Sequence, residues 1–203
     1  MGSMSTAWII SDPHFGHGIA SRERGFTSPA DHDRWLLDLC SRRFQPGDDV
    51  WWLGDIAFDG WRDRLPNTIG AMPAQSHHLV LGNHDRPHPL NRNGHAYAAE
   101  YLRWFSTVQM AAKLRWEGRE VVLSHFPYDG DHTREERYDE WRLRDRGISL
   151  IHGHTHSAEK FSRSKSGTLQ IHAGVDAWRA PVALSILLLE AEAWIKARSI
   201  DNP

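Results

Sequence analysis

Cysteine is nearly absent from this chain, because Cys40 is the only one among its 203 residues. An intramolecular disulfide is therefore excluded, and the composition suits a reducing compartment, so we expect a cytoplasmic protein. Cys40 lies within an apolar helical pattern, which indicates a packed core residue rather than a nucleophile. The sequence also lacks an N-terminal apolar run long enough for a signal peptide or a membrane span.

Charge of either sign is not in excess, since the formal net charge is −2. This balance gives no reason to expect an extended nucleic-acid footprint, and we expect no membrane partner either. The length favours one domain over residues 1–203, as a monomer or a homodimer. Residues 1–3, which precede Met4, resemble an expression-vector remnant.

Histidine is what the sequence has in unusual number, with 14 residues spread along the chain. Many of them stand in short polar islands, each directly after an apolar run that reads as a buried strand. The predicted strands cover residues 7–11, 50–53, 77–81, 121–123, 149–151 and 169–173. Polar side chains are costly at such positions unless they bind something.

Helices are predicted between these strands. Ser28 followed by Pro29 indicates a helix start, and Pro46 with Gly47 ends that helix. Thr133 and Glu136 offer a capping box for a solvated helix within residues 130–147, and the apolar spacing near the C-terminus predicts a helix over 185–198. Residues 16–18 read as a flexible turn. The alternation indicates an α/β sandwich in which helices cover a sheet whose carboxyl strand ends carry the site.

The polar islands together supply oxygen and imidazole ligands and no thiolate. This mixture suits divalent Mn first, with Fe, Zn, Co or Ni as alternatives, whereas Ca and Mg favour oxygen alone. Seven ligands are too many for one tetrahedral ion and suit two ions that share a carboxylate, roughly 3.5–4 Å apart. Such a pair of ions binds a phosphate and generates hydroxide near neutral pH, so the expected reaction is hydrolysis of a phosphate ester. The seven candidate ligands are Asp12, His14, Asp55, Asn83, His125, His154 and His156.

Five motifs stand in a fixed order along residues 8–176. They are Asp12-Pro13-His14, Gly54-Asp55, Gly82-Asn83-His84-Asp85, His125 and Gly153-His154-Thr155-His156. The chain resembles the calcineurin-like metallophosphoesterases, whose pattern these motifs match, and within them the small single-domain phosphodiesterases of bacteria and phages. The resemblance implies a four-layer-like α/β fold, a β-sandwich flanked by helices.

The resemblance also assigns roles to the matched residues. It implies that the first ion is held by Asp12, His14, Asp55 and His156, and that Asp55 bridges to a second ion completed by Asn83, His125 and His154. His84 is then not a ligand; it faces the substrate and stabilises the phosphate charge or protonates the leaving oxygen. Asp85 is expected to orient His84 by accepting a hydrogen bond from its ring.

Two positions depart from the commoner family pattern. Asp85 stands where glutamate is frequent, and His172 stands where many relatives have asparagine. His17, Arg86, Tyr128, His132 and His172 are near enough to the motifs to be considered for the site, and their roles stay open at this point.

The expected function is a dinuclear phosphodiesterase that hydrolyses small nucleotide phosphodiesters, such as 2′,3′- or 3′,5′-cyclic nucleotides, through attack of metal-bound hydroxide. One alternative is a phosphomonoesterase or nuclease that uses the same site, since fold and ions do not choose the substrate. The other is a catalytically silent metal-binding scaffold for a protein partner.

Overall fold

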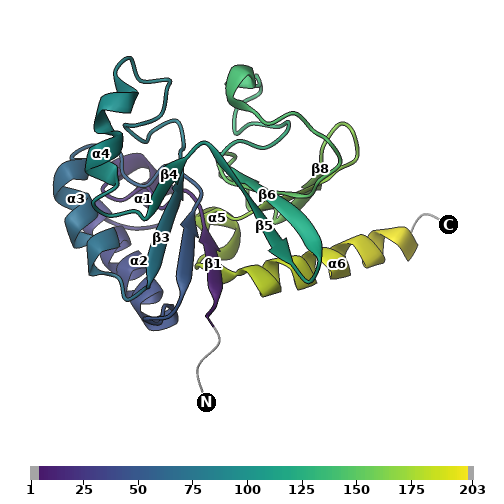
Figure 1. Ribbon diagram of the computed structural model, residues 1–203, viewed down its shortest axis with the longest axis horizontal. Coiled ribbons are helices and arrows are strands. Elements are labelled where there is room, and N and C mark those ends of the chain that lie inside the picture. The colour runs from purple at the N-terminus through teal and green to yellow at the C-terminus, as the bar shows by residue number, and fades with distance from the viewer. Residues whose placement is uncertain (1–4, 201–203) are drawn as a thin grey trace.

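Two five-stranded sheets form the centre of the molecule in a computed structural model that describes residues 5–200. The predicted vector remnant at residues 1–3 lies outside these residues. The first sheet has the order β10-β1-β2-β3-β4 and the second the order β5-β6-β7-β9-β8. Figure 1 shows the two sheets facing each other, with helices at the outer side of the first.

The first sheet is mostly parallel. Its strands are β1 (Ala7–Ile10), β2 (Asp49–Trp52), β3 (Ser76–Val80), β4 (Thr107–Gln109) and β10 (Val182–Ala183), and only β10 runs antiparallel to its neighbour. The register pairs Ile9 with Trp51 and Trp51 with His78. The sequence predicted the first three strands but not β4 or β10, which are short and lie at the two edges.

The second sheet mixes both directions. Its strands are β5 (Ala111–Trp116), β6 (Arg119–Ser124), β7 (Leu150–His152), β8 (Phe161–Arg163) and β9 (Leu169–His172). Strands β6, β7 and β9 are parallel to one another, and the outer strands β5 and β8 are antiparallel to them. The sequence missed β5, where Lys113 and Arg115 interrupt the apolar pattern, and β8, which is only three residues long.

Side-chain alternation along the strands separates two apolar cores. Ile9 and Val80 point between the sheets, where they meet Leu123 and Ile151 from the second sheet. Their neighbours in the chain, such as Ile10, point to the helices on the outer face. Because successive residues of a strand face opposite sides, a strand with both faces buried must be apolar throughout.

Helices α2 (Pro29–Arg43), α3 (Trp61–Asn67) and α4 (Ala98–Tyr101) lie beside the first sheet, as Figure 1 shows. The Ser28 hydroxyl accepts a hydrogen bond from the backbone N–H of Asp31 at 3.2 Å, so the predicted cap is confirmed. Leu36 and Cys40 of α2 are fully buried in the core under these helices. Short 3-10 segments, Ile69–Ala71 and Gly94–Tyr97, complete this layer.

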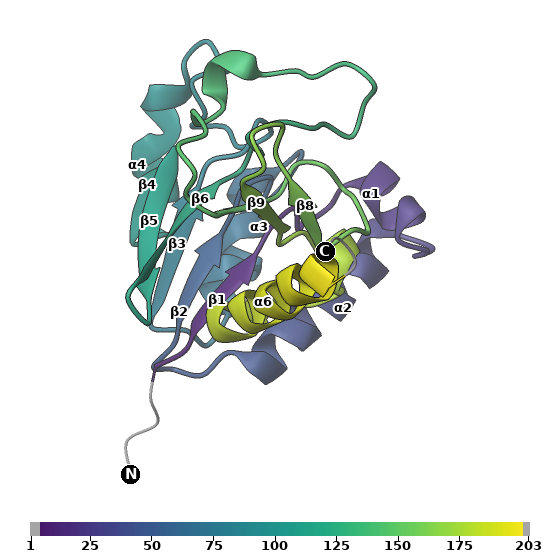
Figure 2. The ribbon, with the colours of Figure 1, turned by 90° about the vertical axis from the view of Figure 1, so that its right-hand side faces the viewer.

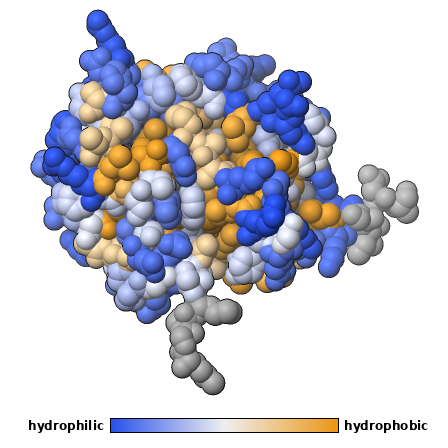
Figure 3. Space-filling model, in the orientation of Figure 1, coloured by the Kyte–Doolittle hydropathy of each residue, from blue (hydrophilic) through white to orange (hydrophobic). Residues whose placement is uncertain are grey.

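Helix α6 (Leu184–Ile200) extends the predicted C-terminal helix by a residue or two at each end. Leu184, Leu187 and Ala191 pack into the core between the sheets. Figure 2 places α6 alongside β1 and the second sheet. Figure 3 shows that apolar residues also gather in the middle of the face over β4, β5 and β6. No helix among residues 5–200 is long and apolar enough to cross a membrane.

The structure corrects two local predictions. Residues 16–18 do not form only a turn, because a short helix, α1 (Gly18–Glu23), begins there. The helix expected within residues 130–147 is wrong: the segment is a loop with one 3-10 turn, Asp139–Trp141. Its side chains make other contacts: Asp131 accepts the Arg137 backbone N–H at 3.1 Å within the loop, and Glu136 pairs with Lys165, outside the loop, instead of capping a helix. The predicted α/β fold with two sheets flanked by helices is confirmed.

Candidate metal centre and active site

The predicted ligands lie at the carboxyl ends of strands from both sheets. Asp12 and Asp55 follow β1 and β2 of the first sheet, and His125 follows β6 of the second. The sheets face each other, so the loops at these ends meet over one cavity. This is the edge at which parallel sheets bind ligands.

Backbone hydrogen bonds continue between the loops after β1 and β2. The N–H of Asp12 donates to the carbonyl of Gly54 at 3.1 Å, and the N–H of His14 donates to the carbonyl of Asp55 at 3.0 Å. Gly54 has φ +86°, and a Cβ there would stand 2.5 Å from the backbone nitrogen of Gly82. Only glycine lets the two motif loops approach this closely.

Left-handed backbone conformations gather at the site. Non-glycine residues rarely adopt positive φ, and the strain persists only where the surroundings hold it. Eight non-glycine residues in the described part of the chain have positive φ, and five of them are predicted ligands. The five are Asp12, His14, Asp55, His154 and His156, with φ of 55°, 49°, 55°, 67° and 49°.

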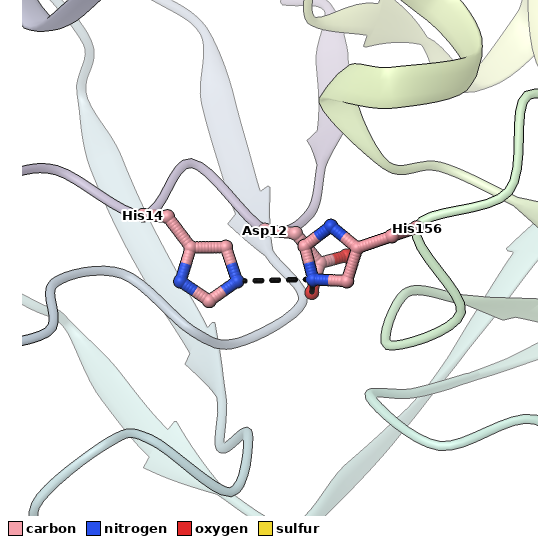
Figure 4. Close-up of side chains that lie close together, drawn as sticks. All are labelled: Asp12, His14 and His156. Atoms are coloured by element: carbon pink, nitrogen blue, oxygen red, sulfur yellow. Dashed lines mark hydrogen bonds and ion pairs between the residues drawn. The ribbon is translucent and has the colours of Figure 1, made fainter. Parts of the chain in front are cut away.

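Three predicted ligands of the first ion converge on one point. Figure 4 shows the rings of His14 and His156 facing each other beside the carboxylate of Asp12. The two Nε2 atoms are 3.2 Å apart, and His156 Nε2 is 3.9 Å from Asp12 Oδ1. His14 Nε2 is also 3.7 Å from Asp55 Oδ2. The ligand atoms of Asp12, His14 and His156 lie within 4.8 Å of one another, close enough for one cation to contact all three.

Asp55 reaches the second group with the same oxygen. Its Oδ2 is 3.5 Å from His125 Nε2, which in turn is 3.2 Å from Asn83 Oδ1. One carboxylate oxygen therefore stands between His14 and His125, as a bridging ligand must. The ring of His154 lies 5.2 Å from that of His125, so it borders the same group.

Burial and charge show that this donor set fits divalent cations. Asp12 and Asp55 are almost completely buried, and the side chains around them are mainly histidines. Burial raises the pKa of Asp55 to about 6, although the charge of His125 opposes the shift. Burial also lowers the pKa of His14, which favours the neutral ring that a metal needs. A cation placed here would offset the cost of the buried carboxylates.

His84, which the family resemblance implies to face the substrate, lines the cavity. Its side chain is 39% exposed, and its Nε2 is 4.0 Å from Asp55 Oδ2. Its backbone N–H donates to Asp55 Oδ1 at 2.9 Å. Burial lowers the pKa of its ring, while the charge of Asp85 acts in the opposite direction.

The predicted contact between Asp85 and the His84 ring is not present. The Asp85 carboxylate is fully buried and accepts three backbone N–H groups, from Asp55 at 3.0 Å, from Ile56 at 3.0 Å and from Gly82 at 2.8 Å. Burial raises its pKa to about 7. Asp85 therefore joins the loops after β2 and β3, because its short side chain turns into the loop and away from the ring.

Three residues near the ligands escaped the sequence analysis. The Asp131 carboxylate is 3.2 Å from His154 Nε2, and the Asp176 carboxylate accepts a hydrogen bond from His156 Nδ1 at 2.9 Å. Arg24 makes a bidentate pair with Asp176, with both distances 2.8 Å. Asp176 stands in a polar island after β9 and could have been found from that pattern, whereas Asp131 and Arg24 carry no comparable signal.

The cavity beside these groups measures about 420 Å³. Helix α1 contributes Ile19, Ala20 and Glu23 to one wall, and the loop after β6 contributes His132 to another. The ring of His17 also lines it and stacks on Phe58, with centroids 4.4 Å apart and planes inclined by 21°.

The structure also places the other residues whose roles the sequence left open. Arg86 lies over the ring of Tyr97, 4.6 Å from its centroid. Tyr128 donates its hydroxyl hydrogen to the carbonyl of Ile148. His172 is buried, with its ring centroid 5.5 Å from that of His152. Of the five open residues, His17 and His132 line the cavity, and Arg86, Tyr128 and His172 are not among its lining residues.

Comparison with known proteins gives matches over most of the chain. Residues 6–193 match the family model of the calcineurin-like phosphoesterase superfamily domain. The chain is 43% identical over 184 residues to the Gene 66 protein of Mycobacterium phage D29, covering 86% of this chain and 90% of that protein. The Gene 66 protein of Mycobacterium phage L5 is 40% identical over 185 residues, with 86% and 88% covered. A protein of unknown function from Aquifex aeolicus shares the fold, with a TM-score of 0.63, 22% identity and coverage of 88% and 95%.

Proposed function

The chain belongs to the calcineurin-like phosphoesterase superfamily and is a metal-dependent phosphoesterase, and we propose that it hydrolyses small nucleotide phosphodiesters with two divalent ions. Asp12, His14, Asp55 and His156 hold the first ion in this proposal, and Asn83, His125 and His154 complete the second with Asp55. When bound, the ions supply positive charge for the phosphate and a nucleophile derived from water.

The charge of the cavity supports a diester over a monoester. Among the described residues that line it there is no Lys or Arg, and Glu23 adds a negative charge to one wall. A diester carries one negative charge near neutral pH, whereas a monoester carries nearly two. With no lysine or arginine beside the ions, the singly charged substrate costs less to bind. This lack of lysine and arginine in the lining is the observation that carries the proposal.

The stacked pair of His17 and Phe58 supports a nucleotide. Phe58 is 40% exposed, and its ring centroid lies 5.2 Å from that of His84, so it presents a flat apolar surface beside His84. Ile19 is 55% exposed and lines the same cavity as His17. A nucleobase gains stacking and apolar burial on such a wall without needing a specific hydrogen bond.

The exposure and surroundings of His84 support a role as the proton donor. Its ring faces the cavity next to Asp55, and the described residues make no hydrogen bond to either of its ring nitrogens. In this proposal the ring stabilises the charge of the bound phosphate and then protonates the leaving oxygen. Its partial exposure leaves it able to exchange that proton with solvent.

Hydrolysis of bis-p-nitrophenyl phosphate and of p-nitrophenyl phosphate, both with Mn added, tests the choice of substrate. We expect faster diester turnover, and Glu23→Lys should lower the KM for the monoester more than that for the diester. Glu23→Gln is the matched control for loss of the carboxylate alone. Monoester preference in the wild type would indicate a phosphomonoesterase, and metal binding without turnover of either ester would indicate a scaffold.

A separate experiment tests whether the substrate is a nucleotide. A screen of cyclic nucleotides, dinucleotides and short RNA should identify the preferred class. Phe58→Ala should raise the KM for the nucleotides several-fold and leave that for an aliphatic diester, glycerophosphoethanolamine, nearly unchanged. Equal effects on both substrates would show that Phe58 does not contact the base.

A further inference from the structure

The turn Gly153-His154-Thr155-His156 presents two imidazoles that the sequence motif does not distinguish. In the structure each ring meets a different carboxylate through a different nitrogen. His154 Nε2 is 3.2 Å from Asp131 Oδ2, and His156 Nδ1 is 2.9 Å from Asp176 Oδ2. A neutral imidazole has one N–H and one lone pair, so each contact leaves the opposite nitrogen of that ring to act as a ligand.

Asp131 is held by two arginines as well as by His154. Its side chain is fully buried, with Arg137 Nη2 at 3.0 Å and Arg142 Nη2 at 3.4 Å. Burial raises its pKa, but the hydrogen bonds from Arg137 and His154 hold the pKa well below its usual range. The ligand atoms of Asp131, His132 and His154 lie close enough together to suggest a site for a third cation. Two guanidinium groups already pair with the Asp131 carboxylate and would repel such a cation, so we interpret Asp131 as the acceptor of a hydrogen bond from His154.

Asp176 is held in the same manner by Arg24, whose side chain is 2% exposed. Nε and Nη2 of Arg24 donate to the two Asp176 oxygens, and Nη2 also donates to the carbonyl of Asp12 at 2.8 Å. Nη1 contacts the carbonyl of Pro13 and Nε2 of His32, both at 3.1 Å. All five guanidinium N–H groups are thus used. Arg24 fixes Asp176 relative to the Asp12-Pro13 turn.

We propose that Asp131 and Asp176 are positioning residues that hold the rings of His154 and His156, so that His154 can serve one ion through Nδ1 and His156 the other through Nε2. The inference rests on the two-ion function proposed above. The arginines matter because each carboxylate is paired and oriented before any ion binds. A carboxylate behind a ligating histidine fixes the tautomer and raises the basicity of the ligand.

The nitrogen that carries the proton can be observed directly. We would load the wild-type protein with Zn²⁺, which is diamagnetic, and record two-bond ¹H–¹⁵N correlations of the ¹⁵N-labelled histidine rings. The expected spectrum shows the proton on Nε2 of His154 and on Nδ1 of His156. The opposite tautomer at either ring would overturn the proposal for that ring, without any variant that must fold.

Metal affinity supplies the second readout. Asp131→Asn and Asp176→Asn keep the side-chain shape and remove the charge, so each should weaken the binding of one ion by about 10- to 100-fold. At limiting Mn²⁺ with a competing chelator, each single variant should lose about one ion per chain, and the double variant both. Glu100→Gln is the matched control, since Glu100 makes a bidentate pair with Arg62 that is not part of the cavity lining.

The outcomes separate the inference from the proposed function. Fewer than two ions bound by the wild-type protein would refute the two-ion function itself. Two ions in the wild type and unchanged affinity in both aspartate variants would refute the positioning role. Loss of both ions in either single variant would also refute it, because the two carboxylates would then not act on separate ions.

Discussion

Gly54 should be a residue where a single added methyl group damages the site. Gly54→Ala places a Cβ 2.5 Å from the nitrogen and 2.6 Å from the Cα of Gly82, both backbone atoms that cannot move aside cheaply. The same Cβ meets Nδ1 of His125 at 2.6 Å. The loops after β2 and β3 must therefore separate, which moves Asp55 away from Asn83.

The loss of stability in Gly54→Ala has two causes, the positive φ and the steric clash, and each can be measured separately. Positive φ costs a non-glycine residue roughly 1–2 kcal/mol, and overpacking typically adds about 1–3 kcal/mol. Gly167 is the matched control, because its φ of +85° equals the +86° of Gly54 within a degree and no atom lies within 4 Å of its Cβ position. Gly167→Ala should therefore show the conformational cost alone, and Gly54→Ala about 2–5 kcal/mol in total.

Urea unfolding, followed by tryptophan fluorescence with chelator present, gives both values in metal-free protein. Metal content at limiting Mn²⁺ gives the second comparison, and we expect it to fall in Gly54→Ala and to stay at the wild-type level in Gly167→Ala. Equal stability losses in the two variants would refute the reasoning, since the contact with Gly82 would then cost nothing.

Three further predictions concern other residues. Cys40 is fully buried and burial raises the pKa of its thiol, so Ellman's reagent should label it only after unfolding; rapid labelling of native protein would contradict this. Asp85→Ala should lower the free energy of unfolding by about 2–4 kcal/mol, more than His84→Ala does, because three buried N–H groups lose their acceptor. Burial lowers the pKa of His77 from 6.5 to about 4, and Trp52 donates a hydrogen bond to its Nδ1. As the pH falls, the unfolded chain therefore binds a proton at His77 before the folded chain does, so the free energy of unfolding should be roughly 2 kcal/mol lower at pH 5 than above pH 6.5. Urea unfolding of His77→Gln at pH 7 and pH 5 should show a smaller difference than the wild type, and an equal difference would count against His77.

The sequence predicted the features that depend on residues close together in the chain. Burial on both faces makes a strand apolar throughout, so β1, β2 and β3 could be read from their composition, and the polar residues after them marked the strand ends. Ser28 predicted the start of α2 because the cap is a contact between residues three apart. The seven candidate ligands also followed from the sequence, since each occupies a motif position next to a strand end.

The tertiary structure decided what depends on distant residues. The partition of the strands into two sheets is not visible in the chain, because the pattern of a buried strand does not identify its neighbours. The segment 130–147 has helical charge spacing, yet Asp131 is bound by arginines and by His154, 23 residues further on, and the helix does not form. Asp85 was expected to hold His84, and its short side chain instead accepts N–H groups from another loop.

The composition and motif order of this protein therefore determined its family, its metal-dependent chemistry and the identity of its candidate ligands, because each of these depends on residue type at the end of a strand. Only the tertiary structure decided which carboxylates stand behind the histidines and that no arginine or lysine lines the cavity among the described residues. These properties arise where loops from two sheets meet, and no local pattern records which side chains face each other there.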